Sequence, residues 1–198
     1  MRLPLLLLSV TALAGCATGG ATRSGPVEVT RYHLGQAPAQ GTVAVVPVGG
    51  ADSASPGYLA YAEAVTGELG SMGYAAAPAT DATYLAAVGF ARAPRGTVTQ
   101  RPPVSIGLGG GSFGRGFGGG AGVSFGLGGN RTSEVLVNEL TVQLRRRADD
   151  TIVWEGRAQT QSVERIDAAV PPTASAGRLA NALFRGFPGQ SGITTTVP

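Results

Sequence analysis

Alternating apolar and polar side chains predict a β-hairpin in residues 134–163. On the first arm, 134–147, four apolar side chains share one parity: Leu136, Leu140, Val142 and Leu144. The second arm, 151–163, continues this apolar face with three more: Ile152, Trp154 and Ala158. A period of two is typical of a strand with one buried face, and the intervening Ala148-Asp149-Asp150 is typical of a turn.

Three further segments are expected to be strands. Residues 27–34 alternate imperfectly, with Val27, Val29 and Arg31 on one face. Residues 42–48 form a short, β-branched apolar run, which indicates a strand buried on both faces and, because of its proline, near a sheet edge or bulge. Residues 84–91 have the composition of a strand.

Two helices are predicted from apolar side chains spaced three and four apart. The first begins with Ser55 as N-cap and Pro56 at the first helical position, and Gly73 ends it. Its apolar face consists of Tyr58, Tyr61, Ala62, Val65, Leu69 and Met72. The second opens at Pro171-Pro172, carries Leu179, Leu183 and Phe187, and stops at Pro188-Gly189. We therefore expect a single α/β (α+β) domain with a mixed or antiparallel sheet of about five strands and two helices packed on it.

Residues 107–129 interrupt this pattern because more than half of them are glycine. Ordering so much glycine costs backbone entropy, so we expect a disordered loop. Gly109, Gly111 and Gly114 match the spacing of a dinucleotide-binding fingerprint, but no strand-turn-helix frame surrounds them. A tolerated surface insertion is favoured over a loop that docks on another envelope component.

The N-terminus has the layout of an export signal. Arg2 precedes an apolar run that is shorter than the roughly 20 residues of a membrane-spanning helix, and small residues close the segment. Leu13-Ala14-Gly15-Cys16 resembles the bacterial lipobox, which implies acylation of the Cys16 thiol and cleavage before it. The expected organisation is a cleaved signal peptide (1–15), a lipidated Cys16 with a flexible tether (16–26), a folded domain (27–188) and a polar tail (189–198).

The amino-acid composition excludes several kinds of binding site. The net charge is +3 and the basic residues, all Arg, are scattered, so no basic stripe for nucleic acid exists and no nucleic-acid partner is expected. A lone cysteine excludes an internal disulfide, and with His33 as the one histidine no zinc site of the usual type can form. We predict no metal and no cofactor.

Catalytic residues are equally hard to nominate. His33 lies within a predicted strand, and no nucleophile-elbow motif is present. Asp149 and Asp150 lie in a turn, and Glu155 has the outward parity beside Trp154. The run 145–147, three arginines, could contact lipid headgroups or peptidoglycan carboxylates, but a solvated hairpin tip is favoured. We expect no enzyme.

Several segments together resemble the envelope lipoproteins grouped as domain-of-unknown-function family 4136. They are VTRYHL (29–34), TVAVVPV (42–48), LGSMGY (69–74), the Gly-rich insertion, TIVWEG (151–156) and ALFRGFPGQSG (182–192). The resemblance implies an α/β domain with helices against a mixed or antiparallel sheet, and it supplies no catalytic residues.

The function expected from these patterns is a non-enzymatic, lipid-anchored module on the inner leaflet of the outer membrane, where Ala17 after the cysteine is compatible with transfer. It would face the periplasm and bind an envelope protein or peptidoglycan. An alternative is a carrier or sensor for a small apolar ligand between helix and sheet, in a pocket lined by Tyr58, Tyr61, Trp154 and Phe187. A hydrolase, less favoured, would need His33 beside a nucleophile in a cleft.

Overall fold

The computed structural model describes residues 22–50, 52–100, 105–107, 124–126, 131–165 and 171–198. The predicted signal peptide, Cys16 and the first part of the tether lie outside these residues. Most of the Gly-rich segment 107–129 also lies outside them, so the expectation of disorder stays a prediction.

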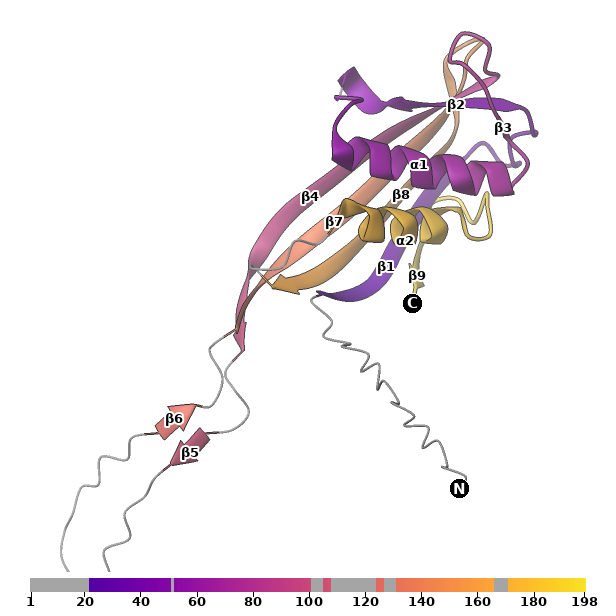
Figure 1. Ribbon diagram of the computed structural model, residues 1–198. Coiled ribbons are helices and arrows are strands. Elements are labelled where there is room, and N and C mark those ends of the chain that lie inside the picture. The colour runs from indigo at the N-terminus through magenta and orange to yellow at the C-terminus, as the bar shows by residue number, and fades with distance from the viewer. Residues whose placement is uncertain (1–21, 51, 101–104, 108–123, 127–130, 166–170) are drawn as a thin grey trace, which may run out of the picture.

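Seven strands form one mixed sheet, which confirms the predicted fold class (Figure 1). In chain order they are β1 (Thr22–His33), β2 (Thr42–Pro47), β3 (Ala75–Ala76), β4 (Tyr84–Gln100), β7 (Arg131–Arg146), β8 (Thr151–Arg165) and β9 (Thr194–Val197). Their spatial order is β3-β2-β4-β7-β8-β1-β9. β2 runs parallel to β3 and β4, and the remaining neighbours are antiparallel. Two short strands, β5 (Ser105–Gly107) and β6 (Ser124–Gly126), pair separately.

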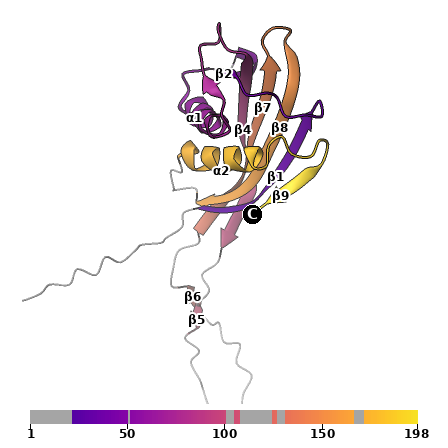
Figure 2. The same ribbon diagram turned by 90° about the vertical axis from the view of Figure 1, so that its right-hand side faces the viewer.

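Both predicted helices are present and lie side by side on one face of the sheet (Figures 1 and 2). α1 spans Pro56–Ser71, and the Ser55 hydroxyl accepts a hydrogen bond from the Tyr58 amide at 3.2 Å, as expected of an N-cap. A short 3₁₀ turn, η1 (Val48–Gly50), follows β2 and leads to the segment before α1. α2 spans Pro172–Phe184, so the prediction that Phe187 belongs to this helix is wrong. The chain turns at Gly186, whose φ of 72° is the left-handed conformation that ends helices.

The core lies between the helices and the covered face of the sheet. Its fully buried large side chains alternate along the strands and repeat along the helices, and they include Trp154, Leu140, Leu144, Val27, Val29, Leu69, Leu179 and Leu183. Ile152 departs from the predicted face and is 41% exposed. The reason is a bulge: Leu144 pairs with Trp154 but Arg145 pairs with Ile152, so the extra Val153 reverses the parity beyond it.

The sheet is wider than predicted because of its edges. β1 begins at Thr22, so residues 22–26 belong to a strand rather than to the tether. In the predicted polar tail, β9 pairs with β1 from Val27↔Val197 to Thr30↔Thr194. β-Branched Thr and Val favour strands, and β9 satisfies backbone groups of β1 that would otherwise form an open edge.

Candidate functional site

The face of the sheet opposite the helices is polar, and we call it the open face. In β8 the residues with the parity of Trp154 are buried towards the helices, while their neighbours point the other way. Register extends this second set across β7 and β1. The open face of these three strands carries Glu28, Thr30, Tyr32, Glu139, Thr141, Gln143, Glu155, Arg157, Gln159 and Gln161, with Val135, Val137 and Val163 at one end.

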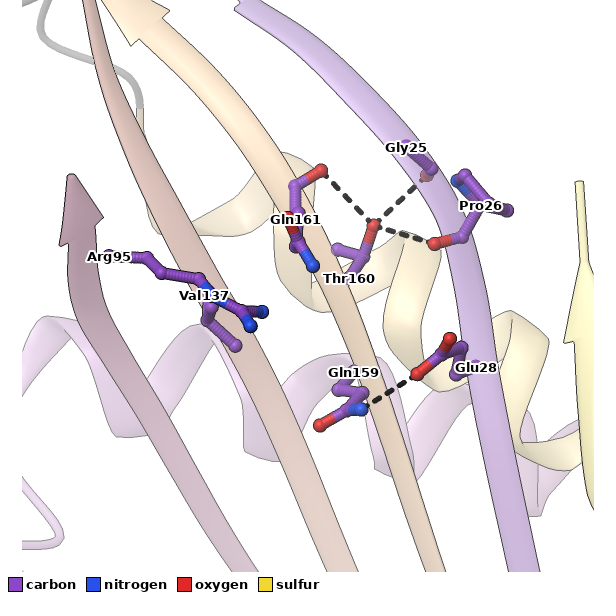
Figure 3. A pocket seen from close by; sticks show the side chains of 8 residues that line it. All are labelled: Gly25, Pro26, Glu28, Arg95, Val137, Gln159, Thr160 and Gln161. Atoms are coloured by element: carbon purple, nitrogen blue, oxygen red, sulfur yellow. Dashed lines mark hydrogen bonds between the residues drawn. The ribbon is translucent and has the colours of Figure 1, made fainter. Parts of the chain in front are cut away.

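The open face is hollowed where β1 and β8 meet. One cavity, of about 290 Å³, is lined by residues that include Gly25, Glu28, Arg95, Gln159 and Gln161. Glu28, Gln159 and Gln161 have the parity of the open face, so the cavity lies on the side of the sheet away from the helices (Figure 3). A second hollow, of about 320 Å³, shares Glu28 and Gln159 with the first and adds Thr30, Arg157 and Thr194. We call the two together the polar trough.

Two β-bulges border the first cavity. In β1 the register shifts between Ser24 and Val27, and the Thr160 hydroxyl lies 3.0 Å from Gly25 O and 3.1 Å from Pro26 O, where it donates to the bulged backbone. In β4 the register shifts between Pro94 and Gly96, which leaves Arg95 without a ladder partner. Bulges often redirect side chains next to functional sites, and Figure 3 shows the Arg95 side chain beside Val137, reaching towards β8.

Hydrogen bonds hold the side chains of the trough in place. Gln159 Nε2 donates to Glu28 Oε2 at 2.8 Å, and the hydroxyls of Thr30 and Thr194 are 2.7 Å apart. Arg157 forms an ion pair with Glu139 on the same face. Glu28 and Arg95 bring opposite charges to the first cavity, so the trough is close to neutral. Gln159 and Glu28, and Thr30 and Thr194, are held by these hydrogen bonds before a ligand arrives.

His33 lies at the end of β1 and is held by backbone groups. Its Nδ1 accepts a hydrogen bond from the Gly35 amide, and its Nε2 is 3.1 Å from Gly189 O, so Nε2 carries the proton. The Ser191 hydroxyl is nearby but accepts from the His33 backbone amide rather than contacting the ring. This arrangement fixes the β1 end against the C-terminal segment and offers no serine–histidine pair.

The charged tip of the β7–β8 hairpin is paired internally. Arg145 pairs with Asp150, and Arg146 Nη1 lies 2.9 Å from Asp149 Oδ2. Arg147 Nε donates to Ala82 O at 2.7 Å. Hydrogen bonds from Thr151, together with the nearby Arg146, lower the pKa of Asp149. These contacts agree with the solvated hairpin tip favoured from the sequence.

The four aromatic residues suggested for an apolar pocket are packed in the core and do not surround a common space. Trp154 is 1% exposed, stacks on Phe184 and donates from Nε1 to Pro188 O at 3.0 Å; Phe187 packs against its ring. Tyr61 stacks on Phe90 with ring centroids 5.1 Å apart, and burial raises its pKa to about 12.

Tyr58 borders a different space, a groove of about 420 Å³ between α1 and the sheet edge at β2 and β3. Val43, Val45 and the exposed Leu59 also line it.

Sequence reasoning missed the residues of the trough. Their one available signal was the pair of prolines, Pro26 and Pro94, inside otherwise strand-like segments, since proline in a strand often marks a bulge. Nothing local in the sequence showed that these two bulges lie on either side of β7 and β8.

Two further features of the described residues concern metal binding and membrane spanning. Within the part of the chain that the structure describes, no three His, Cys, Asp or Glu side chains gather as metal ligands would. Neither of the described helices is both long and apolar enough to cross a bilayer.

The chain is similar to known proteins in sequence and in structure. An uncharacterised protein of Zymomonas mobilis is 42% identical over 78 residues, which are 39% of this chain and 29% of that protein. The matched region thus spans less than a third of this relative's length. A PDZ domain protein from Parabacteroides distasonis superposes with a TM-score of 0.47 at 10% identity, covering 88% of this chain and 38% of the other. A PelC dodecamer subunit from Paraburkholderia phytofirmans superposes with a TM-score of 0.37 at 14% identity, covering 79% of this chain and 93% of the other.

A protein-family model matches more of the chain than the sequence relative does. The model of a domain of unknown function, DUF4136, matches residues 49–189, from η1 to the segment that follows α2. Two of the segments that suggested this family, 29–34 and 42–48, lie before the matched region. The others lie wholly or largely within it, so the resemblance is confirmed, and the chain belongs to the DUF4136 family.

Proposed function

We propose that the protein is a lipoprotein of the bacterial cell envelope, held at a membrane through acyl chains on Cys16 and facing the periplasm, with a domain that binds a partner and catalyses no reaction. One observation carries the binding role: the open face presents a hollow in which Gln159 and Glu28 are already joined by a hydrogen bond. Preorganised polar groups lose little further freedom when a partner binds.

The anchor is supported by the lipobox-like Leu13-Ala14-Gly15-Cys16. Each buried methylene of an acyl chain contributes about 0.8 kcal/mol, so two or three chains on one cysteine hold a protein at a bilayer stably. β1 begins at Thr22, and the chain between it and Cys16 spans roughly 20 Å at most when fully extended. The domain would therefore act close to the membrane surface.

A binding role is also supported by how the candidate catalytic groups are used. The His33 ring bonds to two backbone groups, and Asp149 and Asp150 bond to arginines. Each group thus has a structural task in the folded chain. Peptidoglycan or an envelope protein would meet the open face from the side away from the helices.

The anchor is tested by the Cys16→Ser variant expressed in a bacterial host and followed by membrane fractionation and metabolic palmitate labelling. We expect the unmodified chain to incorporate palmitate and to sediment with membranes, and the variant to do neither. Thr18→Ser, which keeps the thiol, is the matched control and should behave as the unmodified chain does. Equal retention of Cys16→Ser in the membrane fraction would overturn the proposed anchor.

A second candidate, a carrier of a small apolar ligand, is favoured by the groove between α1 and β2. Leu59 lines this groove and is 53% exposed, so its side chain is available to contact an apolar ligand. The full chain would be titrated with an environment-sensitive apolar dye. If the groove is the site, Leu59→Glu should abolish saturable binding, while Val48→Glu, which changes an exposed apolar residue outside the groove lining, should not.

A further inference from the structure

We infer that the polar trough binds a short stretch of N-acetylated glycan, with sugar hydroxyls held by Glu28, Gln159 and Arg95 and an acetamido group placed at Val137 and Gln161. This inference deepens the proposed function and rests on it, because it names the chemistry of the partner that the open face would bind.

The side chains of the trough match the hydrogen bonding of sugar hydroxyls. A hydroxyl both donates and accepts, and it needs both kinds of partner at one site. The Glu28 carboxylate accepts, the Arg95 guanidinium donates, and the Gln159 amide does both. The hydrogen bond between Gln159 and Glu28 leaves one carboxylate oxygen and the amide oxygen of Gln159 for a ligand.

An acetamido group has a methyl and an amide, and the first cavity has a partner for each. Val137 and Pro26 are apolar side chains that line it, and Val137 pairs directly with Gln161 across β7 and β8. If the acetamido methyl of the ligand packs on Val137, the amide of the same acetamido group lies beside Gln161. A small apolar contact next to a convergent polar group is the usual way in which a pocket sets specificity.

The trough suits other classes of ligand less well. β4, β7 and β8 are hydrogen-bonded to neighbours on both sides, and so is β1 from Val27 to Thr30, so a peptide cannot join as an added strand along these residues. Glu28 balances Arg95, and Glu139 pairs with Arg157, so a polyanion or an anionic membrane finds little net positive charge. Acyl chains would leave the second Glu28 carboxylate oxygen and the Gln159 amide oxygen without hydrogen bonds.

The shape of the trough fits a chain rather than a single sugar. From Gly25 to Thr30 the strand covers at most about 17 Å, because the β1 bulge shortens it, and this is about the length of two to three linked sugars. Tyr32, 55% exposed, follows Thr30 on the same face of β1. Its ring offers a flat surface on which a further sugar can stack.

The test is calorimetric titration of the full chain, purified in a detergent without a sugar headgroup, with triacetylchitotriose. We expect saturable binding in the millimolar range or tighter. Cellotriose, which has the same linkage without acetamido groups, should bind about fivefold more weakly, because the methyl contact with Val137 and the amide contact with Gln161 are missing. Trialanine should not bind.

Variants locate the site. Gln159→Ala and Arg95→Ala should each weaken triacetylchitotriose binding by about tenfold, as expected for a lost hydrogen-bonding partner of a bound ligand. Gln143→Ala, on the same face but outside the trough lining, is the matched control and should bind as the unmodified chain does. Circular dichroism of each variant establishes that the fold is retained.

Four outcomes would overturn the inference: no saturable binding of triacetylchitotriose, equal binding of cellotriose, binding of trialanine, or an equal loss in Gln143→Ala and Gln159→Ala. None of these depends on Cys16, whereas membrane retention of Cys16→Ser would overturn the anchor and leave the titration unaffected. The two proposals can therefore fail separately.

Discussion

Arg31 is the clearest case of a charged side chain used inside the fold. It is 6% exposed, and its guanidinium donates to Leu183 O at 2.8 Å and to Ala182 O and Arg185 O at 3.0 Å. Ala182 and Leu183 belong to the last turn of α2 and Arg185 directly follows it, where the helix has no further amides to satisfy the carbonyls. A cation there also complements the negative end of the helix dipole. Burial lowers the pKa of Arg31, yet the carbonyls provide its hydrogen bonds.

Replacing Arg31 should therefore destabilise the protein. Arg31→Met keeps most of the side-chain volume but leaves three carbonyls without a donor, and we expect a loss of about 3 kcal/mol in the free energy of unfolding, measured in urea. Arg31→Lys should recover only part of this, because an ammonium group cannot span the same fork of acceptors. Arg185→Ala, which removes an exposed side chain, should change stability by less than about 0.5 kcal/mol. Equal effects of the Met and Ala variants would contradict the capping role.

The buried hydroxyl of Tyr61 makes the free energy of unfolding depend on pH in alkaline solution. Burial raises its pKa to about 12, with Arg92 opposing this slightly, against an ordinary value of 10. Between these two values the folded chain holds the proton more tightly than the unfolded chain does. The stabilisation is thus complete below pH 10 and is lost as the pH rises towards 12. Because the chain contains no Lys, few other side chains titrate in this range.

We therefore expect the free energy of unfolding to fall by about 2 to 3 kcal/mol from Tyr61 between pH 10 and 12. Burial also raises the pKa of Tyr58 and Tyr74, so the unmodified chain should fall further than this. Tyr61→Phe should make the decline shallower, and Tyr32→Phe, at an exposed position, should leave it unchanged. A Tyr61→Phe curve parallel to that of the unmodified chain would show that the hydroxyl is not buried in solution.

Among the elements, α2 packs closely on β8 at Gly156. Gly156 in β8 faces α2, and a methyl group there would overlap the Trp154 ring and lie 2.7 Å from Leu183 Cδ1. Gly177 in α2 has nothing within 4 Å of the same added atom. The two glycines therefore serve different purposes, although the sequence alone does not distinguish them.

Matched alanine substitutions should have opposite signs. Gly156→Ala should lower the free energy of unfolding by about 1 to 3 kcal/mol, because the packed Trp154 and Leu183 must move. Gly177→Ala should raise it by about 0.5 to 1 kcal/mol, because alanine restricts the unfolded chain and favours the helix. Urea unfolding of both variants checks this. A stabilised Gly156→Ala would mean that α2 sits further from β8 than the structure has it.

Element boundaries were predictable where a local signal existed. Ser55-Pro56 located the start of α1, and Asp149 with Asp150 located the turn between β7 and β8. Ile152 was placed on the wrong face because one inserted residue, Val153, reverses the alternation, and the insertion is visible only in the pairing. β9 was missed because a four-residue strand acquires its structure from β1, far away in the chain.

For the molecule as a whole, the seven-stranded sheet is built without residues 101–130. Gln100 of β4 and Arg131 of β7 are register partners, and pairing continues from there to Tyr84 and Arg146. β5 and β6 pair with each other in a separate sheet. The intervening segment is thus an insertion at the end of a continuous hairpin.

Replacing residues 101–130 by Asn-Gly should preserve the fold. A two-residue loop of this type suits paired strand ends, and closing a shorter loop costs less entropy, so stability should stay the same or rise by up to about 2 kcal/mol. Thermal unfolding and triacetylchitotriose titration of this variant provide the check. Loss of cooperative unfolding would show that the inserted segment is part of the core structure.

The sequence by itself determined the strand and helix periods, the N-cap of α1, the hairpin turn and the family, because each is encoded by neighbouring residues. It also placed Arg31 correctly on the buried parity of β1, but not against the end of α2, some 150 residues away. Only the tertiary structure decided the strand order, the edge strand β9 and the polar trough. These depend on strands that meet across the sheet, and on two bulges whose effect on side-chain direction appears only once their neighbours are paired.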